Sequence, residues 1–425
     1  MRSSNRRQTV RVGNLGCGVE LSLEGFVADK QPRIVLVGGG SGGHITPLVA
    51  VAESLRRYEP QCHLVYVGQK GDALATVITQ GNIVDSSRLV SAGKFRRYHG
   101  LGWRNLLKVK TMLLNVRDVF RVVIGFGQSV VLLARLKPKL VFIKGGFVGV
   151  PVGLAAALLR IPYVTHDSDA LPGLANRIVA RWARLHTVAL PAEIYSYPSD
   201  KTVTVGVPVA AAYRPLDSQR RQAARRAVNL SESALILLVS GGGLGAKRLN
   251  DAIVQQAQRL CSTFDDLHIV HQAGRANQQA VQAGYDAAGL HERVTVLGFS
   301  DDFVQYASAA DVVVARAGGS SLAEFAVLGQ AVVLVPNPYL TGGHQLHNAQ
   351  ALRDRSAVRV VQESELGQAT LYDTLSELLA NKQLRDQLGS GLALLAVPDA
   401  SDRLARILLD AAGAGVNKGG ASDAA

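Results

Sequence analysis

A glycine-serine turn in the second half of the chain combines groups that bind a nucleotide. Gly318 to Ser321 stand at the start of an expected short helix, and Glu324 follows one helical turn further on. Amides at a helix start can hold phosphate, and an acid at this distance can accept hydrogen bonds from a ribose diol. An apolar strand from Ala331 to Val335 comes next. The stretch therefore predicts a nucleotide site.

A second glycine turn, Gly38 to His44, lies between an apolar strand at Ile34–Val37 and helical periodicity from Pro47 to Tyr58. Strand, glycine turn and helix form a phosphate-binding unit. Its glycines also match the dinucleotide pattern, which needs an acid about 20 residues on, at the tip of the next strand. That strand, His63–Val67, runs into Gly-Gln-Lys. A nicotinamide or flavin site is therefore disfavoured, and a close-packed turn that binds nothing remains an alternative.

Two more polar turns follow apolar strands in the first half of the chain. Lys144 to Val150 comes after Leu140–Ile143, and His166 to Asp169 comes after Tyr163–Thr165. Repeated strand-helix units imply a parallel sheet, whose ligands bind at the carboxyl ends of the strands. We therefore expect these turns to meet Gly38 to His44 at one edge of a sheet.

The second half repeats this organisation, because Leu235–Val239 runs into the glycine turn Ser240 to Lys247. Further strands are expected at His268–Val270, Val294–Leu297 and Val312–Val314. With 425 residues, 48% hydrophobic residues and 43 glycines, the chain suits an α/β protein of two Rossmann-like domains facing each other across a cleft. The predicted divisions are a flexible basic extension (1–31), a first Rossmann-like domain (32–207), a second Rossmann-like domain (208–396), a helix (397–412) and a disordered tail (413–425).

Charge and cysteine usage limit the class of protein. A formal net charge of +13 calls for an anionic partner or surface. Three cysteines without metal spacing favour a reducing compartment. Uncharged runs are broken by Gly, Pro and polar residues, so no spanning helix is expected. The basic first thirty residues lack an apolar signal-peptide core, and they represent either a flexible extension or a start codon placed too early.

The segment from Ser91 to Phe126 is basic, with aromatic and aliphatic residues between its charges. Such a helix lies on an anionic membrane surface. An ordinary core-packing helix with solvated charges is the alternative, and nucleic acid is disfavoured because no nucleic-acid module accompanies the charge. The predicted membrane residues are Lys94, Phe95, Arg96, Arg97, Trp103, Leu107 and Lys108.

Four motifs in this order and spacing, GGGSGGHITP, KGGFVGVP, HDSDALPGLAN and RAGGSSLAEF, together resemble the MurG family of glycosyltransferases. The likeness runs from about Arg33 to Asp410. It implies the GT-B fold and inverting transfer of N-acetylglucosamine (GlcNAc) from UDP-GlcNAc to the C4 hydroxyl of the lipid-linked muramyl-pentapeptide, lipid I. The product would be lipid II for peptidoglycan synthesis. The resemblance also implies a peripheral protein at the cytoplasmic face of the plasma membrane. In such a protein, residues 32–207 would form the acceptor and membrane-facing domain, and residues 208–396 would form the UDP-sugar-binding domain.

The resemblance assigns roles in donor binding. Glu324 corresponds to the acid that binds both ribose hydroxyls, and amides at a helix start stabilise the departing UDP without a metal. The other predicted donor contacts are Gly318, Gly319, Ser320 and Ser321 at the diphosphate, with Gly243 and Gly245 opposite, Phe299 and Ser300 at uracil, and His344, Gln345 and Asp169 at the sugar. Ser41, Gly42 and Gly43 complete the predicted set.

The predicted catalytic residues are His44 and Asp167. Attack by the C4 hydroxyl needs a general base near pH 7, and His44 is the natural candidate, although it could instead donate to a phosphate or cap its helix. The chain departs from the family's His-Glu-Gln-Asn, since Asp167 and Asp169 replace Glu and Asn. This Asp-x-Asp is similar to a metal-diphosphate motif of another glycosyltransferase fold, but nothing else supports a metal, and we expect neither metal nor cofactor.

Two further departures concern the donor phosphates. Val207-Pro208-Val209-Ala210 lacks the family's phosphate-binding Arg, and the turn at Gly241 to Ala246 lacks a Ser and a Gln. They leave two alternatives open. One is a related transferase acting on a diacylglycerol or another polyprenyl lipid, and the other is a catalytically weak, membrane-docked protein that binds a nucleotide sugar.

Overall fold

The computed structural model describes residues 32–40, 42–72, 78–79, 82–94, 109–339 and 343–413 of the 425-residue chain. The side chains of 109–111 are not included in this description. The predicted extension 1–31, the tail beyond Gly413, the donor contact Ser41 and the membrane residues from Phe95 to Lys108 lie outside the described residues.

The first sheet contains seven parallel strands in the order β3-β2-β1-β4-β5-β6-β7. Its strands are β1 (Arg33–Val37), β2 (His63–Gln69), β3 (Ser86–Val90), β4 (Leu140–Ile143), β5 (Tyr163–Asp167), β6 (Leu185–Val188) and β7 (Thr202–Thr204). The four apolar strands were predicted, whereas β3, β6 and β7 were not. β3 has three exposed positions and β7 is only three residues long, so neither has the apolar run that signals a buried strand.

Helices cover both faces of the first sheet. They are α1 (Gly42–Tyr58), α3 (Val109–Leu136), α4 (Gly149–Leu158) and the short α5 (Leu174–Val179). Side chains of α1 pack on one face with alternate residues of β1 and β2, and those of α4 pack on the other. Val35 and Leu36, neighbours on β1, therefore belong to different apolar clusters.

The second sheet contains six parallel strands in the order β10-β9-β8-β11-β12-β13. The strands are β8 (Leu235–Ser240), β9 (Leu267–Gln272), β10 (Val294–Leu297), β11 (Val312–Ala315), β12 (Ala331–Leu334) and β13 (Arg359–Val360). The helices are α6 (Ser218–Ala227), α7 (Lys247–Thr263), α8 (Gln278–Ala287), α9 (Phe303–Ala309), α10 (Gly319–Leu328), α11 (His344–Arg353), α12 (Ala369–Ala380) and α13 (Lys382–Ala393). The predicted pair of Rossmann-like sheets is confirmed.

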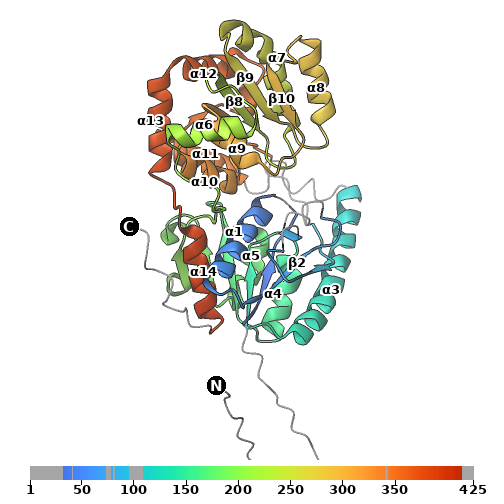
Figure 1. Ribbon diagram of the computed structural model, residues 1–425. Coiled ribbons are helices and arrows are strands. Elements are labelled where there is room, and N and C mark those ends of the chain that lie inside the picture. The colour runs from blue at the N-terminus through green and yellow to red at the C-terminus, as the bar shows by residue number, and fades with distance from the viewer. Residues whose placement is uncertain are drawn as a thin grey trace, which may run out of the picture. The chain divides into compact units, whose positions relative to one another are not determined.

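The last helix, α14 (Ala400–Ala411), packs with the first sheet, although it follows the second in sequence. Leu404 and Leu408 are fully buried among residues of α1 and the first strands. Ser54 of α1 donates a hydrogen bond of 2.7 Å to Asp402. Figure 1 shows α14, in red, beside the blue α1. The core of the first sheet thus depends on the end of the chain.

The basic apolar segment differs from its prediction. Ser91 to Lys94 are not helical, and α3 runs on from Val109 to Leu136. By length and composition alone, Met112–Leu136 could cross a membrane, contrary to our expectation of no such helix. However, α3 packs beside α4, Leu133 is fully buried, and a side chain at Gly125 would overlap the Ser91 carbonyl. These contacts hold α3 on the surface of the first sheet.

Candidate active site

Two glycine turns meet at the carboxyl ends of β1 and β4, as expected from the parallel sheet. Gly146 has φ of +82°, and a side chain there would overlap the carbonyl oxygen of Gly39. A Cβ atom at Gly145 would lie 3.3 Å from the His44 imidazole. Only glycine combines this backbone conformation with such a close approach. The turns therefore form one continuous edge, with His44 beside it.

The hydrogen bond of His44 defines its tautomer. Its Nδ1 lies 3.1 Å from the Gly39 carbonyl oxygen. Because a carbonyl oxygen can only accept, Nδ1 carries the proton and Nε2 is the basic nitrogen. Burial and, to a smaller extent, the positive charge of Lys144 lower the pKa of His44 to about 4, while Asp169 opposes the shift. His44 is therefore a neutral imidazole at pH 7.

Asp167, at the end of β5, is surrounded by hydrogen-bond donors. Its Oδ1 accepts from Gly173 N at 2.9 Å and Asn176 Nδ2 at 3.0 Å, and its Oδ2 accepts from the Tyr197 hydroxyl at 2.8 Å. Burial nevertheless raises the pKa of this carboxyl, against the effect of those donors and of Lys144. The carboxyl thus braces the loop after β5. Its catalytic role stays a prediction.

Lys144 is a site residue that sequence analysis did not single out. It directly follows β4 and is only 3% exposed. Burial lowers its pKa to about 8, although Asp167 and Asp169 raise it. Its electrostatic influence on His44, Asp167 and His166 places a cation at the centre of this edge. Its position immediately after a buried strand was the signal that could have identified it.

The start of α10 lies opposite this edge. Its N-cap residue, Gly318, has no side chain to cap the helix, and Ser320 donates a hydrogen bond of 3.1 Å to the carbonyl of Gly43. This bond joins the predicted diphosphate turn to the first glycine turn. The first amides of a helix have no acceptor within the helix itself, and this geometry favours phosphate.

Glu324 projects from α10 into a buried environment. Burial raises its pKa to about 8, while a hydrogen bond from Tyr213 opposes the shift. Tyr213 lies in the segment that joins the two sheets, between β7 and α6. The family pattern points to an arginine in this segment, so the sequence did not indicate this tyrosine as a partner of the predicted ribose acid.

Asp169 contacts the opposite half of the site. Its Oδ1 accepts a hydrogen bond of 2.8 Å from Asn348 Nδ2 and one of 3.3 Å from Gly319 N. The backbone N–H of Ala170 lies 3.4 Å from Asn348 Oδ1. The predicted sugar contact is therefore bonded to the first helical amide of α10. Asn348, which belongs to α11, was not among the predicted site residues.

The remaining predicted donor contacts lie in the second half of the chain. Gln345 is buried, and its Oε1 accepts from Asn337 N at 2.9 Å. His344 lies close enough to lower the pKa of His44. A Cβ atom at Gly243 would lie 3.8 Å from the Phe299 ring, over which the Arg275 guanidinium sits at 5.0 Å. Three further residues complete the set. They are Gly245, with φ of +75°, Ser300, whose Oγ accepts a hydrogen bond from Asp302 N, and the half-buried Ser321. Their contacts with a ligand stay predictions.

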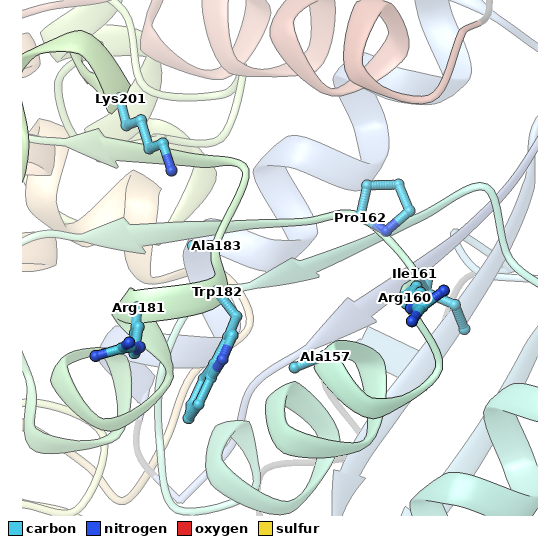
Figure 2. Close-up of a pocket in the computed structure, with 8 residues that line it drawn as sticks. All are labelled: Ala157, Arg160, Ile161, Pro162, Arg181, Trp182, Ala183 and Lys201. Carbon is cyan, nitrogen blue, oxygen red and sulfur yellow. The ribbon is translucent and has the colours of Figure 1, made fainter.

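A pocket of about 360 Å³ lies away from this site (Figure 2). It is lined by Ala157, Arg160, Ile161, Pro162, Arg181, Trp182, Ala183 and Lys201. These residues come just before β5, β6 and β7, so the pocket lies at the amino ends of the strands. Ligands of parallel sheets bind at the opposite ends. Among the described residues, no group of three or more His, Cys, Asp or Glu side chains could hold a metal ion.

Two parallel sheets with helices on both faces, and glycine turns at the carboxyl ends of their strands, define a protein of the GT-B class. The model of the glycosyltransferase family 28 N-terminal domain matches residues 34–187, and that of the C-terminal domain matches residues 236–404. The crystal structure of Acinetobacter baumannii MurG is similar, with 25% identity, a TM-score of 0.65 and coverage of 89% of this chain and 99% of that one.

Curated relatives narrow the class to one family. The UDP-N-acetylglucosamine–N-acetylmuramyl-(pentapeptide) pyrophosphoryl-undecaprenol N-acetylglucosamine transferase of Caldicellulosiruptor saccharolyticus is 31% identical over 375 residues, covering 88% of this chain and 96% of the relative. The corresponding transferase of Bacillus cytotoxicus is 29% identical over 376 residues, covering 88% and 98%. The chain therefore belongs to the MurG family of N-acetylglucosaminyltransferases.

Proposed function

We propose that this chain transfers GlcNAc from UDP-GlcNAc to the C4 hydroxyl of the muramyl sugar of lipid I, which makes lipid II. The observation that carries the proposal is the position of His44. It is a neutral imidazole with a fixed tautomer, and Ser320, at the start of α10, bonds to the adjacent Gly43. A base and a phosphate-binding helix start therefore share one site. The relatives' common activity favours lipid I over a diglyceride acceptor or a binding-only role.

The reaction follows from these groups. Nε2 of His44 takes the proton of the C4 hydroxyl as its oxygen attacks the anomeric carbon of GlcNAc. The bond from that carbon to the β-phosphate oxygen breaks, and attack from the opposite side inverts the anomeric configuration. Negative charge grows on the departing UDP, and the amides at the start of α10 stabilise it. Glu324 accepts hydrogen bonds from the ribose hydroxyls. We propose these steps without a metal, and the absence of a metal from the reaction stays a prediction.

The membrane part of the proposal places α3 against anionic lipid at the cytoplasmic face of the plasma membrane. An apolar stripe follows the helical period along the exposed side of α3, and a contiguous apolar surface of this kind marks an interaction site. The stripe consists of Met112, Leu113, Val116, Val119, Phe120, Val123 and Ile124, each 46–64% exposed. Arg117 and Arg121 lie among them with half-exposed side chains. An amphipathic, basic helix of this kind binds in the membrane interface.

The test of the reaction uses purified protein, UDP-GlcNAc and a short-chain lipid I analogue. We expect a disaccharide product whose linkage is β-1,4 by NMR. A diacylglycerol and an unrelated polyprenyl phosphate sugar compete in parallel reactions. Absence of the β-1,4 product while a MurG control is active would contradict the proposal, as would preference for the diglyceride. UDP binding by calorimetry without turnover on any acceptor would instead favour the binding-only alternative.

A further inference from the structure

The carboxylate of Asp169 takes the place of a helix cap at α10. Gly318, the N-cap residue, offers no side-chain acceptor, and the first helical amide, Gly319 N, instead donates to Asp169 Oδ1 at 3.3 Å. The carboxylate comes from the loop after β5, about 150 residues earlier in the chain. A negative charge at a helix N-terminus is stabilised by the unpaired amides and the helix dipole.

A second bond fixes this carboxylate in place. Asn348 Nδ2 donates to the same Oδ1 at 2.8 Å and also to the Ala317 carbonyl at 3.0 Å, so it links Asp169 to the chain just before the helix. A Cβ atom at Gly319 would lie 3.0 Å from Asp169 Oδ1 and closer still to the Ser168 carbonyl. The loop after β5 therefore lies directly against the helix start, and only a residue without a side chain fits at position 319.

The same amides have a second use in the proposed function. A nucleoside diphosphate bound at the start of α10 needs the first-turn N–H groups as donors. Two anions cannot share the Gly319 amide, and a carboxylate beside a diphosphate adds like-charge repulsion. The family's amide residue at this position, replaced here by Asp169, would carry no such charge.

We propose that Asp169 sets the affinity of the donor site by occupying the diphosphate's place in the donor-free protein, so that UDP or UDP-GlcNAc must displace its carboxylate in order to bind. This inference rests on the proposed function, because it assumes a nucleoside diphosphate at α10. It gives Asp169 a role in addition to the predicted sugar contact. Asp169 thus acts as a latch: its hydrogen bond to Gly319 N connects the two halves of the site until the donor binds and breaks that bond.

The test measures dissociation constants of UDP and uridine by calorimetry for the full chain, Asp169→Asn and Asp169→Ala. Asn keeps the shape of the side chain but removes the charge. We expect Asp169→Asn to bind UDP roughly tenfold more tightly, because a charge-assisted hydrogen bond is about twice as strong as a neutral one. Uridine lacks phosphate, so its dissociation constant should change by less than about twofold. The matched control is Asp373→Asn, which removes an exposed carboxylate of α12 and should change neither constant.

Hydrogen exchange distinguishes the latch from simple repulsion. In the donor-free protein, Asp169→Ala should speed exchange in the peptide that contains the first turn of α10, because that amide loses its acceptor. UDP should restore protection in both proteins. Unchanged exchange, or a UDP affinity equal to or weaker than wild type in Asp169→Asn while wild type binds UDP, overturns the latch alone. If the wild type and both variants bind neither UDP nor uridine, the proposed nucleotide site fails and the latch fails with it.

Discussion

In the proposed reaction, the two ring nitrogens of His44 have separate tasks. Nδ1 donates to the Gly39 carbonyl at 3.1 Å, so the basic lone pair that would take the proton of the attacking hydroxyl is on Nε2. An asparagine side chain at this position can donate the same hydrogen bond to Gly39, but it has no basic nitrogen that could take up the proton. We expect His44→Asn to lower kcat by about 10²- to 10⁴-fold, the usual contribution of a general base, with little effect on UDP affinity.

The pH profile gives an independent test of His44. A pKa lowered to about 4 keeps the imidazole neutral throughout the neutral range, so kcat at saturating UDP-GlcNAc should not fall as pH drops through about 6.5, the ordinary value for histidine. This kcat should fall only as pH approaches the lowered pKa, where the base becomes protonated. An acidic limb near pH 6.5 that disappears in His44→Asn would show that the imidazole is solvated rather than buried.

The raised pKa of Glu324 predicts that a proton is released when UDP binds. Its pKa, raised to about 8 by burial, leaves the carboxyl mostly protonated at pH 7. Two ribose hydroxyls donate best to the ionised form, so binding should expel close to one proton at pH 7, and UDP affinity should rise with pH until about pH 8. Calorimetry in two buffers of different ionisation enthalpy measures this proton. Glu324→Gln is the control and should release none, and equal heats for wild type in both buffers would contradict the assignment.

At the scale of elements, α3 carries the membrane prediction. Phe120 and Val123 are 64% and 62% exposed on its apolar stripe. Replacing both by Asp should reduce co-sedimentation with anionic phosphatidylglycerol vesicles at least several-fold, because charged residues cannot enter the acyl boundary. Leu394→Asp is the control, since this side chain is 86% exposed at the end of α13, in the other half of the chain.

The same assay tests the basic residues predicted from sequence. Replacing Arg96, Arg97 and Lys108 by Glu should lower vesicle binding, and the loss should shrink as ionic strength rises. If only the apolar substitutions in α3 reduce binding, the docking surface is confined to that helix. If neither set does, the membrane prediction is wrong.

At the scale of the whole molecule, α14 ties the end of the chain to the core of the first sheet. Leu408 is fully buried there among residues of α1 and the first strands. Leu408→Ala should lower the free energy of unfolding by about 2–5 kcal/mol, the cost of a cavity in a packed core. UDP affinity should stay within about twofold, because most of the predicted nucleotide contacts lie in the second half of the chain, away from Leu408. Denaturant unfolding measures the loss, and Arg403→Ala, on the exposed side of α14, should leave stability nearly unchanged.

Local pattern was enough to determine most of the fold. Apolar runs of three to five residues, several of them followed by glycine turns, identified β1, β2, β4, β5, β8, β9, β10, β11 and β12, because strands of parallel sheets are buried on both faces. The edge strands β3, β7 and β13 have half-exposed sequences and lack that signal. The motifs also indicated the family, and the glycine turn ending in His44 marked the edge that carries the site.

Contacts between distant segments were decided only by the tertiary structure. The family resemblance implied that Asp169 contacts the sugar, but it could not show that this carboxylate bonds to Gly319 and Asn348, which lie 150 and 179 residues away. The same holds for Tyr213 on Glu324, for Lys144 beside His44, and for α14 on α1. Periodicity reports which face of an element is apolar, whereas partners, burial and the resulting pKa shifts depend on how those faces pack. The sequence therefore identified the glycine-serine turn, but it could not show that the Asp169 carboxylate bonds to an amide of that turn.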